Sequence, residues 1–275
     1  IGLGYKVFNN LSVGANFSYL YGDITHQSMT TIGATDTRSI KLDKFSISDY
    51  KLDFGLQYTY KLNKKNTINI GAVYTLGRTL HGDAYKYHQT GAESNGSIYV
   101  QSQTGDTIPN PFKMPHTFGI GLTYVYDNRL TIGVDYTLQK WNTADLAWSK
   151  FNKESVEMNS RTKIAFGAEF VPSYISHNYL KRIRYRMGAY YSSPYNKVSY
   201  TSPDTGTTSF QDGAREYGVS IGFGLPMFQS KSMLNISGQY IKVSPKFKGL
   251  MEENYLRINI GLTFNERWFM KWKVD

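Results

Sequence analysis

The chain has 275 residues, of which 40% are hydrophobic and 19% charged, and its formal net charge is +10. The length suits one large all-β domain, and no stretch approaches the ~20 consecutive apolar residues of a membrane-spanning helix, which excludes a helical membrane protein. The absence of cysteine excludes disulfides and thiolate chemistry and fits a bacterial envelope protein. The positive charge alone allows nucleic acid, anionic lipid headgroups or an acidic protein as partner.

Alternating side chains recur along the chain, and the clearest example is the segment 117–139. Its halves, TFGIGLTYVY and LTIGVDYTLQ, place bulky apolar residues on one parity and small or polar residues on the other, around the turn Asp127-Asn128. Because successive side chains of a strand point to opposite faces, each half is predicted to be a strand with one apolar and one polar face. The same pattern predicts eleven strands, at about 1–7, 11–23, 50–62, 67–76, 117–126, 130–139, 162–170, 182–191, 216–225, 234–241 and 255–264.

The connections between these strands alternate in length. Short turns are expected at 9–10, 63–66, 127–128, 176–181 and 228–232, and long polar loops at 24–46, 81–112, 142–160, 195–213 and 245–253. This separation is typical of an outer-membrane barrel, with short periplasmic turns and long extracellular loops. A soluble sandwich or lipocalin-like barrel has no reason to segregate loop length in this way.

The two faces of the strands indicate the solvent on each side. As the interior of a small soluble barrel, the polar face would bury many charges at high cost, so the apolar face is expected to meet lipid and the polar face to line a lumen. The predicted lumen-facing residues are Asp53, Asp135, Lys163, Glu169, Arg182, Arg184, Arg186 and Arg257. The predicted aromatic girdles at the membrane interfaces contain Tyr19, Tyr21, Tyr58, Tyr60, Tyr124, Tyr126, Trp268 and Trp272.

Three arginines, Arg182, Arg184 and Arg186, are the sharpest electrostatic feature and are expected on one lumen-facing strand. They allow two interpretations: a rung that guides anions, or ion pairs with lumen carboxylates such as Glu169 or with a plug. Pairing is the favoured interpretation. The basic tail, in which tryptophans are interleaved with Arg267, Lys271 and Lys273, suits lipid headgroups better than nucleic acid. Loop cations are expected to pair with lipopolysaccharide phosphates.

Motifs of enzyme chemistry are missing from the sequence. It has no Gly-x-Ser-x-Gly elbow, HExxH helix or phosphate-binding glycine loop. The pair His81 and Asp83 near a rim is a weak candidate for a metal or catalytic site. We therefore expect no catalytic residue, no metal and no cofactor.

Two hairpins and the C-terminal segment resemble known barrels. GLGYKVFNNLSVGANFSYLYGDI and KMPHTFGIGLTYVYDNRLTIGVDYTLQKW are similar to hairpins of FadL-type outer-membrane transport proteins, and GLTFNERWFMKWKVD looks like the closing strand and tail of Bacteroidetes barrels. The resemblance implies a fourteen-stranded barrel that carries hydrophobic compounds across a Gram-negative outer membrane, with an N-terminal plug in its lumen. The FadL-type family that this chain resembles also includes a branch that does not transport and serves as a partner barrel in protein secretion.

Eleven strands are an odd number, whereas bacterial single-chain barrels have even numbers. The chain opens inside an alternating run, so 1–275 is expected to be one barrel domain that lacks its first strands and plug.

Two functions remain open. One is uptake of hydrophobic small molecules through a porin-like channel. The other is a scaffold subunit of a larger outer-membrane secretion or assembly complex, in which the segment 81–112 either docks a partner or is an ordinary loop.

Overall fold

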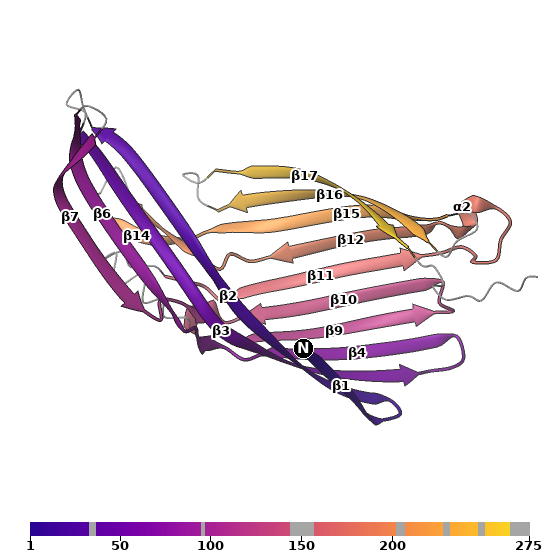
Figure 1. Cartoon of the computed structure of the whole chain (residues 1–275). Helices are drawn as coiled ribbons and strands as arrows, with labels where there is room; N and C mark the ends of the chain where they lie inside the picture. The colour runs from indigo at the N-terminus through magenta and orange to yellow at the C-terminus, as the bar shows by residue number, and fades with distance from the viewer. Residues whose placement is uncertain are drawn as a thin grey trace, which may run out of the picture.

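A large antiparallel sheet forms nearly the whole molecule (Figure 1). The computed structural model describes residues 1–32, 37–94, 97–143, 157–201, 207–227, 232–246 and 251–264. The eleven predicted strands are confirmed, and together they form the wall. In sheet order they are β1 (Gly2–Phe8), β2 (Leu11–Ile32), β3 (Thr37–Lys61), β4 (Asn66–Thr75), β9 (Thr117–Tyr126), β10 (Leu130–Gln139), β11 (Arg161–Phe170), β12 (Arg184–Ser192), β15 (Ala214–Pro226), β16 (Met233–Pro245) and β17 (Glu253–Thr263).

Among the described residues, a few elements lie outside the wall. They are β5 (Arg78–Thr79), β6 (Gly82–Ser94), β7 (Ser97–Pro109), β8 (Lys113–Met114), β13 (Lys197–Thr201), β14 (Thr208–Asp212), the 3-10 turn η1 (Trp141–Thr143) and the short helix α2 (Tyr179–Arg182). Within the described ranges, no helix combines the length and the apolar character needed to cross a bilayer.

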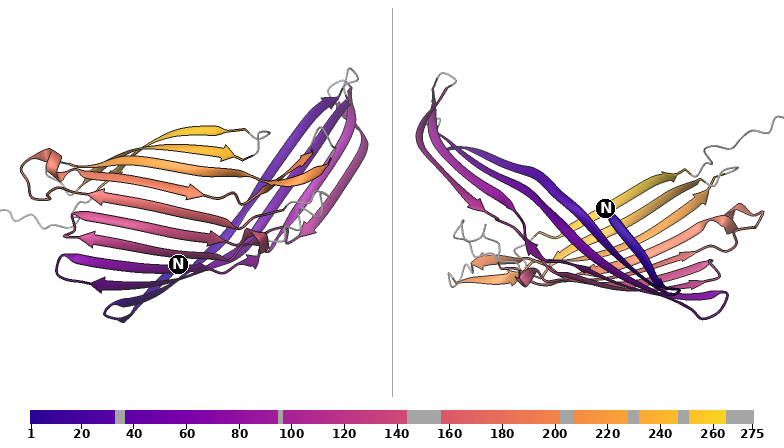
Figure 2. Two further views of the ribbon diagram at one scale, coloured as in Figure 1. Left: turned by 180° about the vertical axis from the view of Figure 1, so that it is seen from behind. Right: turned by 60° about the horizontal axis from the view of Figure 1, so that its bottom comes forward.

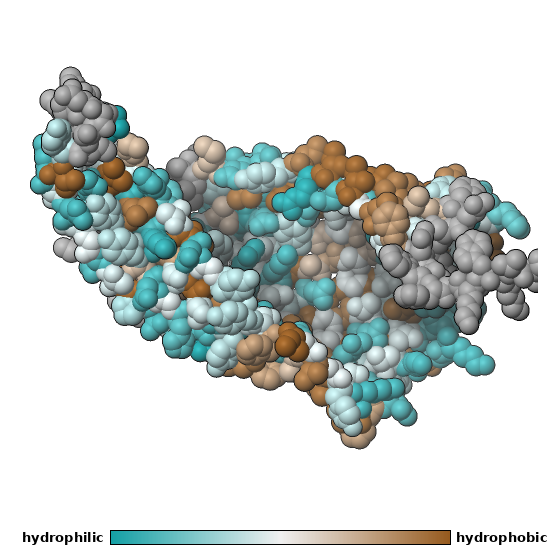
Figure 3. Space-filling view, in the orientation of Figure 1, coloured by the Kyte–Doolittle hydropathy of each residue, from teal (hydrophilic) through white to brown (hydrophobic). Residues whose placement is uncertain are grey.

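The register of the wall places apolar side chains in continuous rows on one face. Ile70, Leu122, Val134 and Phe166 lie side by side across β4, β9, β10 and β11. These side chains are unusually open, and Leu122 is 50% exposed. A row of bare aliphatic and aromatic groups at mid-strand is unfavourable in water but suits lipid. The opposite face carries the polar residues, and Figure 3 shows teal and white side chains in the hollow of the sheet, with brown ones along the rim over β17.

The turn Asp127-Asn128 forms as expected. Both residues have positive φ values, 50° and 53°, the conformation that two-residue hairpin turns require and that Asn and Asp tolerate best. Arg129 N donates to Tyr126 O at 2.8 Å across the turn, and the strand ladder begins with Tyr126 opposite Leu130. The hairpin therefore keeps the alternation of both strands in phase.

The prediction of long loops at 24–46 and 81–112 is wrong. Strands β2 and β3 continue far beyond the wall and pair with each other up to Ile32 and Thr37. β6 pairs with the upper part of β3, and β7 pairs with β6. We call this four-stranded extension the blade: residues 20–32 of β2, 37–47 of β3, β6 and β7. Figures 1 and 2 show it standing away from the rest of the sheet.

The missed strands have a physical explanation. Within the blade both sheet faces are solvent-accessible in large part, so its strands have no need to alternate apolar with polar residues. Their residues are instead mostly Thr, Ser, Tyr, Ile and Lys, which read as loop by periodicity alone. The expected loop 195–213 likewise contains the hairpin β13–β14. Of the other two expected loops, 144–156 and 247–250 lie outside the described residues.

Candidate functional site

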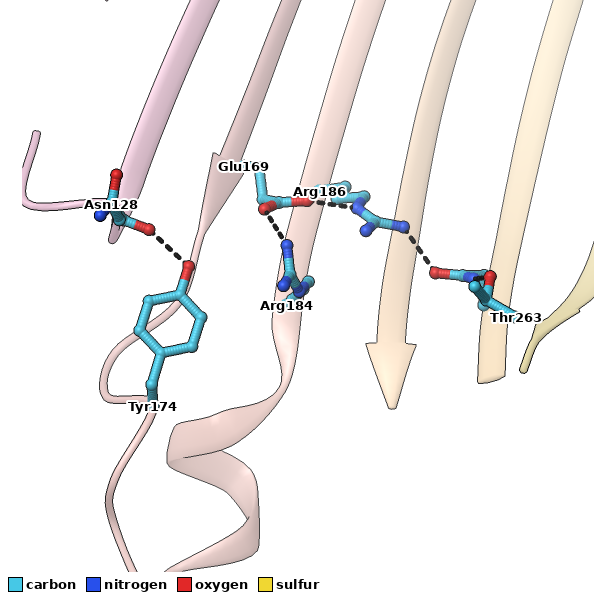
Figure 4. A network of polar contacts seen from close by, with 7 residues as sticks. Asn128, Glu169, Tyr174, Arg184, Arg186 and Thr263 are labelled. Carbon is cyan, nitrogen blue, oxygen red and sulfur yellow. Dashed lines mark hydrogen bonds and ion pairs between the residues drawn. The ribbon is translucent and has the colours of Figure 1, made fainter. Parts of the chain in front are cut away.

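A polar network lies on the polar face of the wall, near the end with short turns (Figure 4). Glu169 on β11 is paired in register with Arg186 on β12. Its carboxylate accepts from Arg184 Nη1 at 2.9 Å and from Arg186 Nε at 2.7 Å. One carboxylate therefore holds two guanidinium groups, and the cluster keeps one excess positive charge.

The network continues across the sheet to β16 and β17. Arg186 Nη1 donates to Asn235 Oδ1 at 2.8 Å, and the Asn235 amide donates to Thr263 Oγ1 at 3.3 Å. Arg184 and Arg186 thus form ion pairs with Glu169, as predicted by the interpretation in which the arginines pair with lumen carboxylates. Charge-assisted bonds of this kind stiffen neighbouring strands. They also occupy three of the guanidinium nitrogens, Arg184 Nη1 and Arg186 Nε and Nη1, that an anion-guiding rung could use.

Arg182 is not part of this network, so the prediction that three arginines share one strand is wrong. It ends helix α2, and β12 begins only at Arg184. The reason is local: Asn178 caps the helix, with its side chain accepting from Leu180 N at 3.0 Å. Arg182 lies 5.6 Å from the Tyr179 ring centroid instead.

The other predicted polar residues are spread over the same face. Asp53 accepts from Lys51 Nζ at 2.8 Å and from Thr75 Oγ1 at 2.6 Å. Lys163 lies 4.7 Å from the ring centroid of Tyr190. Arg257 is paired in register with Gln239. The structure does not bring them together into one site.

A second cluster, towards the long-connection end, was missed by sequence reasoning. Tyr190 donates to Glu216, and Glu216 forms an ion pair with Arg161 at 3.7 Å. Arg161 Nε also donates to Ser192 Oγ at 2.7 Å. These residues come from β11, β12 and β15. The only available signal was their polar parity, because the contacts depend on register between strands far apart in sequence.

Beside these clusters, over β1 to β4, β9 and β10, the polar face is hollow. A cavity of about 590 Å³ is lined by Gly4, Gly14, Gly55, Gly71, Gly121, Ser12, Gln57, Asn69, Thr123 and Asp135, with a few small apolar residues. A Cβ added at Gly71 would meet no atom within 4 Å. Gly4 and Gly71 therefore widen the hollow without being required by close packing, whereas a Cβ at Gly121 would clash with Asp135 Oδ1.

The predicted aromatic residues lie near both ends of the wall. Tyr58, Tyr60, Tyr124 and Tyr126 are near the short turns, and Tyr124 donates to Asn66 Oδ1. Tyr19 and Tyr21 lie at the other end, where their rings stack at 5.6 Å. Tyr21 is 80% exposed. Trp268 and Trp272 are outside the described residues.

A buried carboxylate holds the fork where the blade leaves the wall. β3 pairs with β4 only from Asp53 onward and with β6 only up to Ile47. Between them lies Asp49, which is 5% exposed. It accepts from His81 N at 2.8 Å, His81 Nδ1 at 3.0 Å and Tyr50 N at 2.7 Å, and pairs with Arg78 at 3.3 Å.

The fork lies outside the β3–β4 ladder of the wall. The groups that surround Asp49 there favour the charged form of its carboxyl. Burial by itself raises the pKa of the Asp49 carboxyl. The backbone N–H groups of His81 and Tyr50, the His81 ring and the Arg78 charge outweigh burial and hold the pKa below its usual value of 3.8. Arg78 is also placed over the Tyr50 ring at 3.8 Å. The ionised carboxylate therefore ties β3, the start of β6 and the segment after β4 together.

The histidines show no metal-ligand arrangement. His81 binds Asp49, His88 contacts Ser39 Oγ at 3.0 Å, and His116 contacts the Tyr74 hydroxyl at 2.8 Å. Across the described ranges, no group of three His, Asp or Glu side chains gathers in a way that would hold a metal ion.

Removing the carboxylate of Glu169 tests the polar network. Glu169→Gln is expected to lower the free energy of unfolding by about 1–2 kcal/mol, because two partly exposed guanidinium groups lose their shared negative charge and one of its two acceptor oxygens. Urea unfolding followed by heat-modifiable gel migration measures it. The matched control is Asp135→Asn, which removes a carboxylate from the glycine-lined hollow instead. Equal effects of the two changes would show that the network adds nothing specific.

The family model described as BamG matches residues 1–275. The chain belongs to the BamG family. Among solved structures, this BamG-family chain is similar to the deltaS2S3 mutant of TodX, a monoaromatic hydrocarbon channel, at a TM-score of 0.54 and 13% identity over 94% of the chain. It is similar to a FadL homologue of Pseudomonas aeruginosa at a TM-score of 0.54 and 13% identity over 89% of the chain.

At this identity the likeness shows the fold alone: a wall of the kind found in outer-membrane β-barrels. The chain spans 67% of the TodX mutant and 58% of the FadL homologue. No curated protein sequence matches this BamG-family chain significantly.

Proposed function

We propose that this BamG-family chain is a partner barrel of an outer-membrane protein-assembly complex and does not itself transport. In this proposal, residues 1–275 are one barrel domain, the short turns face the periplasm, and the blade contacts another subunit outside the membrane. The family name points to association with outer-membrane assembly components. The blade is the single observation that carries the proposal.

The blade has the properties of a surface that another protein covers. It is a single layer of four strands, and a single layer cannot bury a core of its own. Apolar side chains on it are exposed, among them Tyr21, Ile24, Met29, Tyr85 and Tyr99. A patch of this kind on a soluble surface marks an interaction site. The buried Asp49 at its root supports a fixed direction for the blade.

The polar face of the wall supports a subunit more than a channel for hydrophobic cargo. It carries the Glu169 network and the Tyr190–Glu216–Arg161 cluster, which lie beside the hollow and towards opposite ends of the wall. Ligand sites for apolar molecules are lined mainly by hydrophobic and aromatic side chains. The lining here is mostly glycine, amide, hydroxyl and carboxylate.

Uptake of hydrophobic small molecules is the second candidate. The fold is that of TodX and FadL-type channels, and such a channel would bind its ligand inside the barrel. This candidate needs an apolar path through the lumen, for which the described polar face offers little.

Gentle detergent extraction of native outer membranes tests the proposal. We expect the tagged chain to elute in size-exclusion chromatography with stoichiometric companion proteins, identified by mass spectrometry. The control is an unrelated tagged outer-membrane barrel extracted in the same way. A lone particle that carries bound fatty acid or hydrocarbon would contradict the proposal and favour uptake. The same preparation tests for bound lipopolysaccharide, the lipid partner expected from the loop cations.

A further inference from the structure

The outer edge of β7 is open. In the sheet, β7 pairs with β6 and with no other described strand. Its residues from Tyr99 to Thr107 are exposed. A free edge presents unpaired N–H and C=O groups, which an extended polypeptide can match by adding a strand.

The register of β7 against β6 shows which backbone groups point outward. Asn110 N donates to Gly82 O at 2.7 Å, so this pair is hydrogen-bonded. Every second pair along the ladder is then hydrogen-bonded too, and these pairs contain Ile108, Asp106 and Thr104. Hydrogen-bonded and non-hydrogen-bonded pairs alternate in an antiparallel ladder. Gln103, Gly105 and Thr107 therefore direct their N–H and C=O groups away from β6.

The edge is kept regular and carries little protection. Natural edges are commonly blunted by lysine, proline or bulges. The run from Ser102 to Ile108 has no lysine, arginine or proline, and the register shift of β7 lies beyond it, where Thr90 and Gly91 meet the strand. The Tyr85 hydroxyl lies 3.0 Å from where a Cβ of Gly105 would be, so the ring covers this glycine and supports the strand.

One outward-pointing N–H group of β7 is hydrogen-bonded to a side chain of the same strand. Thr107 N donates to the side chain of Asp106 at 2.8 Å. Asp106 is the one charged residue of β7. It is exposed next to the open edge and is paired in register with Lys86 of β6 on its other side. A basic side chain on an incoming strand would attract this carboxylate and leave Thr107 N–H for the carbonyl of that strand. The charge at the edge thus specifies the chemistry of the occupant.

We propose that the β7 edge binds an extended segment of a partner protein by strand addition, with a lysine or arginine of that segment opposite Asp106. This inference rests on the proposed function as a partner barrel. Backbone hydrogen bonds to Gln103 and Gly105 can form with a segment of any sequence. The ion pair with Asp106 then sets the register of the segment along β7. The opposite edge of β7 keeps its ladder with β6 unchanged.

A pair of substitutions at one residue separates backbone pairing from side-chain effects. Gln103→Pro removes an outward N–H without taking a bond from the β6 ladder, a position where an edge strand tolerates proline. Gln103→Ala truncates the same side chain and keeps the N–H. The probe is a labelled synthetic peptide of ~9 residues that alternates threonine and valine around a central lysine, a length within the ~3–10-residue range of typical strands.

Fluorescence anisotropy with the detergent-purified chain gives the result. We expect the peptide to bind Gln103→Ala like wild type and Gln103→Pro at least about tenfold more weakly, because one hydrogen-bonded pair is lost and the ring obstructs the edge. A central glutamate in the peptide should weaken binding, and Asp106→Asn should abolish this preference. No binding of the lysine peptide to wild type, or equal binding to both Gln103 variants, overturns the inference. Unchanged hydrogen-exchange protection of β6 verifies that the blade is folded.

The same two variants, extracted from native membranes, separate this inference from the proposed function. Companions lost from Gln103→Pro and retained by Gln103→Ala support strand addition. Companions retained by both variants overturn the edge inference and leave the partner-barrel function standing. Companions absent already from wild type overturn the proposed function itself, whatever the peptide shows.

Discussion

Replacing Asp49 with alanine is expected to lower the free energy of opening the blade by about 3–5 kcal/mol, which is the usual cost of removing one partner from a buried ion pair. Arg78 would be left near the fork without its carboxylate, and His81 N and Tyr50 N would lose their acceptor. Hydrogen exchange of the blade strands measures the change, because protection reports local opening. The wall strands β9 to β11 should keep their protection.

Two controls and the dependence on pH sharpen this test. Asp23→Ala removes an exposed aspartate from the neighbouring strand β2 and should leave protection nearly unchanged. The lowered pKa of Asp49 means that its stabilisation is complete above the unfolded value of about 4 and is lost as pH falls through the lower folded pKa. Wild-type blade protection should therefore fall below pH 4, and in Asp49→Asn this acid-dependent part should be absent. Loss of protection in the wall as well would contradict a local role.

Lysine in place of Leu122 is expected to destabilise the wall by about 2–4 kcal/mol, the cost of a charge near the middle of a bilayer. Leu122 is half-exposed in the middle of β9, on the apolar face. The matched change is Thr123→Lys, one residue further along the same strand. Thr123 lines the polar hollow with Asp135, where an ammonium group remains hydrated and meets an opposite charge. We expect the second change to cost little.

Unfolding in urea after reconstitution into lipid vesicles measures both variants. Near-equal destabilisation by the two lysines, or a larger effect of Thr123→Lys, would mean that the apolar face of β9 is not in contact with lipid. The comparison holds strand, neighbours and introduced side chain constant, so the difference between the two reports the solvent of each face.

The wall was predictable because the bilayer imposes a period of two on every strand that crosses it. Rows such as Ile70, Leu122 and Val134 follow directly from this period, and the Asp127-Asn128 turn follows from the tolerance of these residues for positive φ. The Glu169 pairs with Arg184 and Arg186 were also foreseeable in outline. These residues lie on two consecutive predicted strands, and consecutive strands joined by a short connection usually pair.

The blade and its fork were decided by tertiary structure alone. Segments 24–46 and 81–112 do not alternate apolar with polar residues, so periodicity does not mark them as strands. Their pairing depends on β3 changing partner from β4 to β6. Asp49, Arg78 and His81 meet only because of that change. The Tyr190–Glu216–Arg161 cluster likewise depends on the register of three strands. The sequence by itself therefore determined which face of each wall strand meets lipid, whereas long-range pairing decided the blade, its buried carboxylate and its open edge.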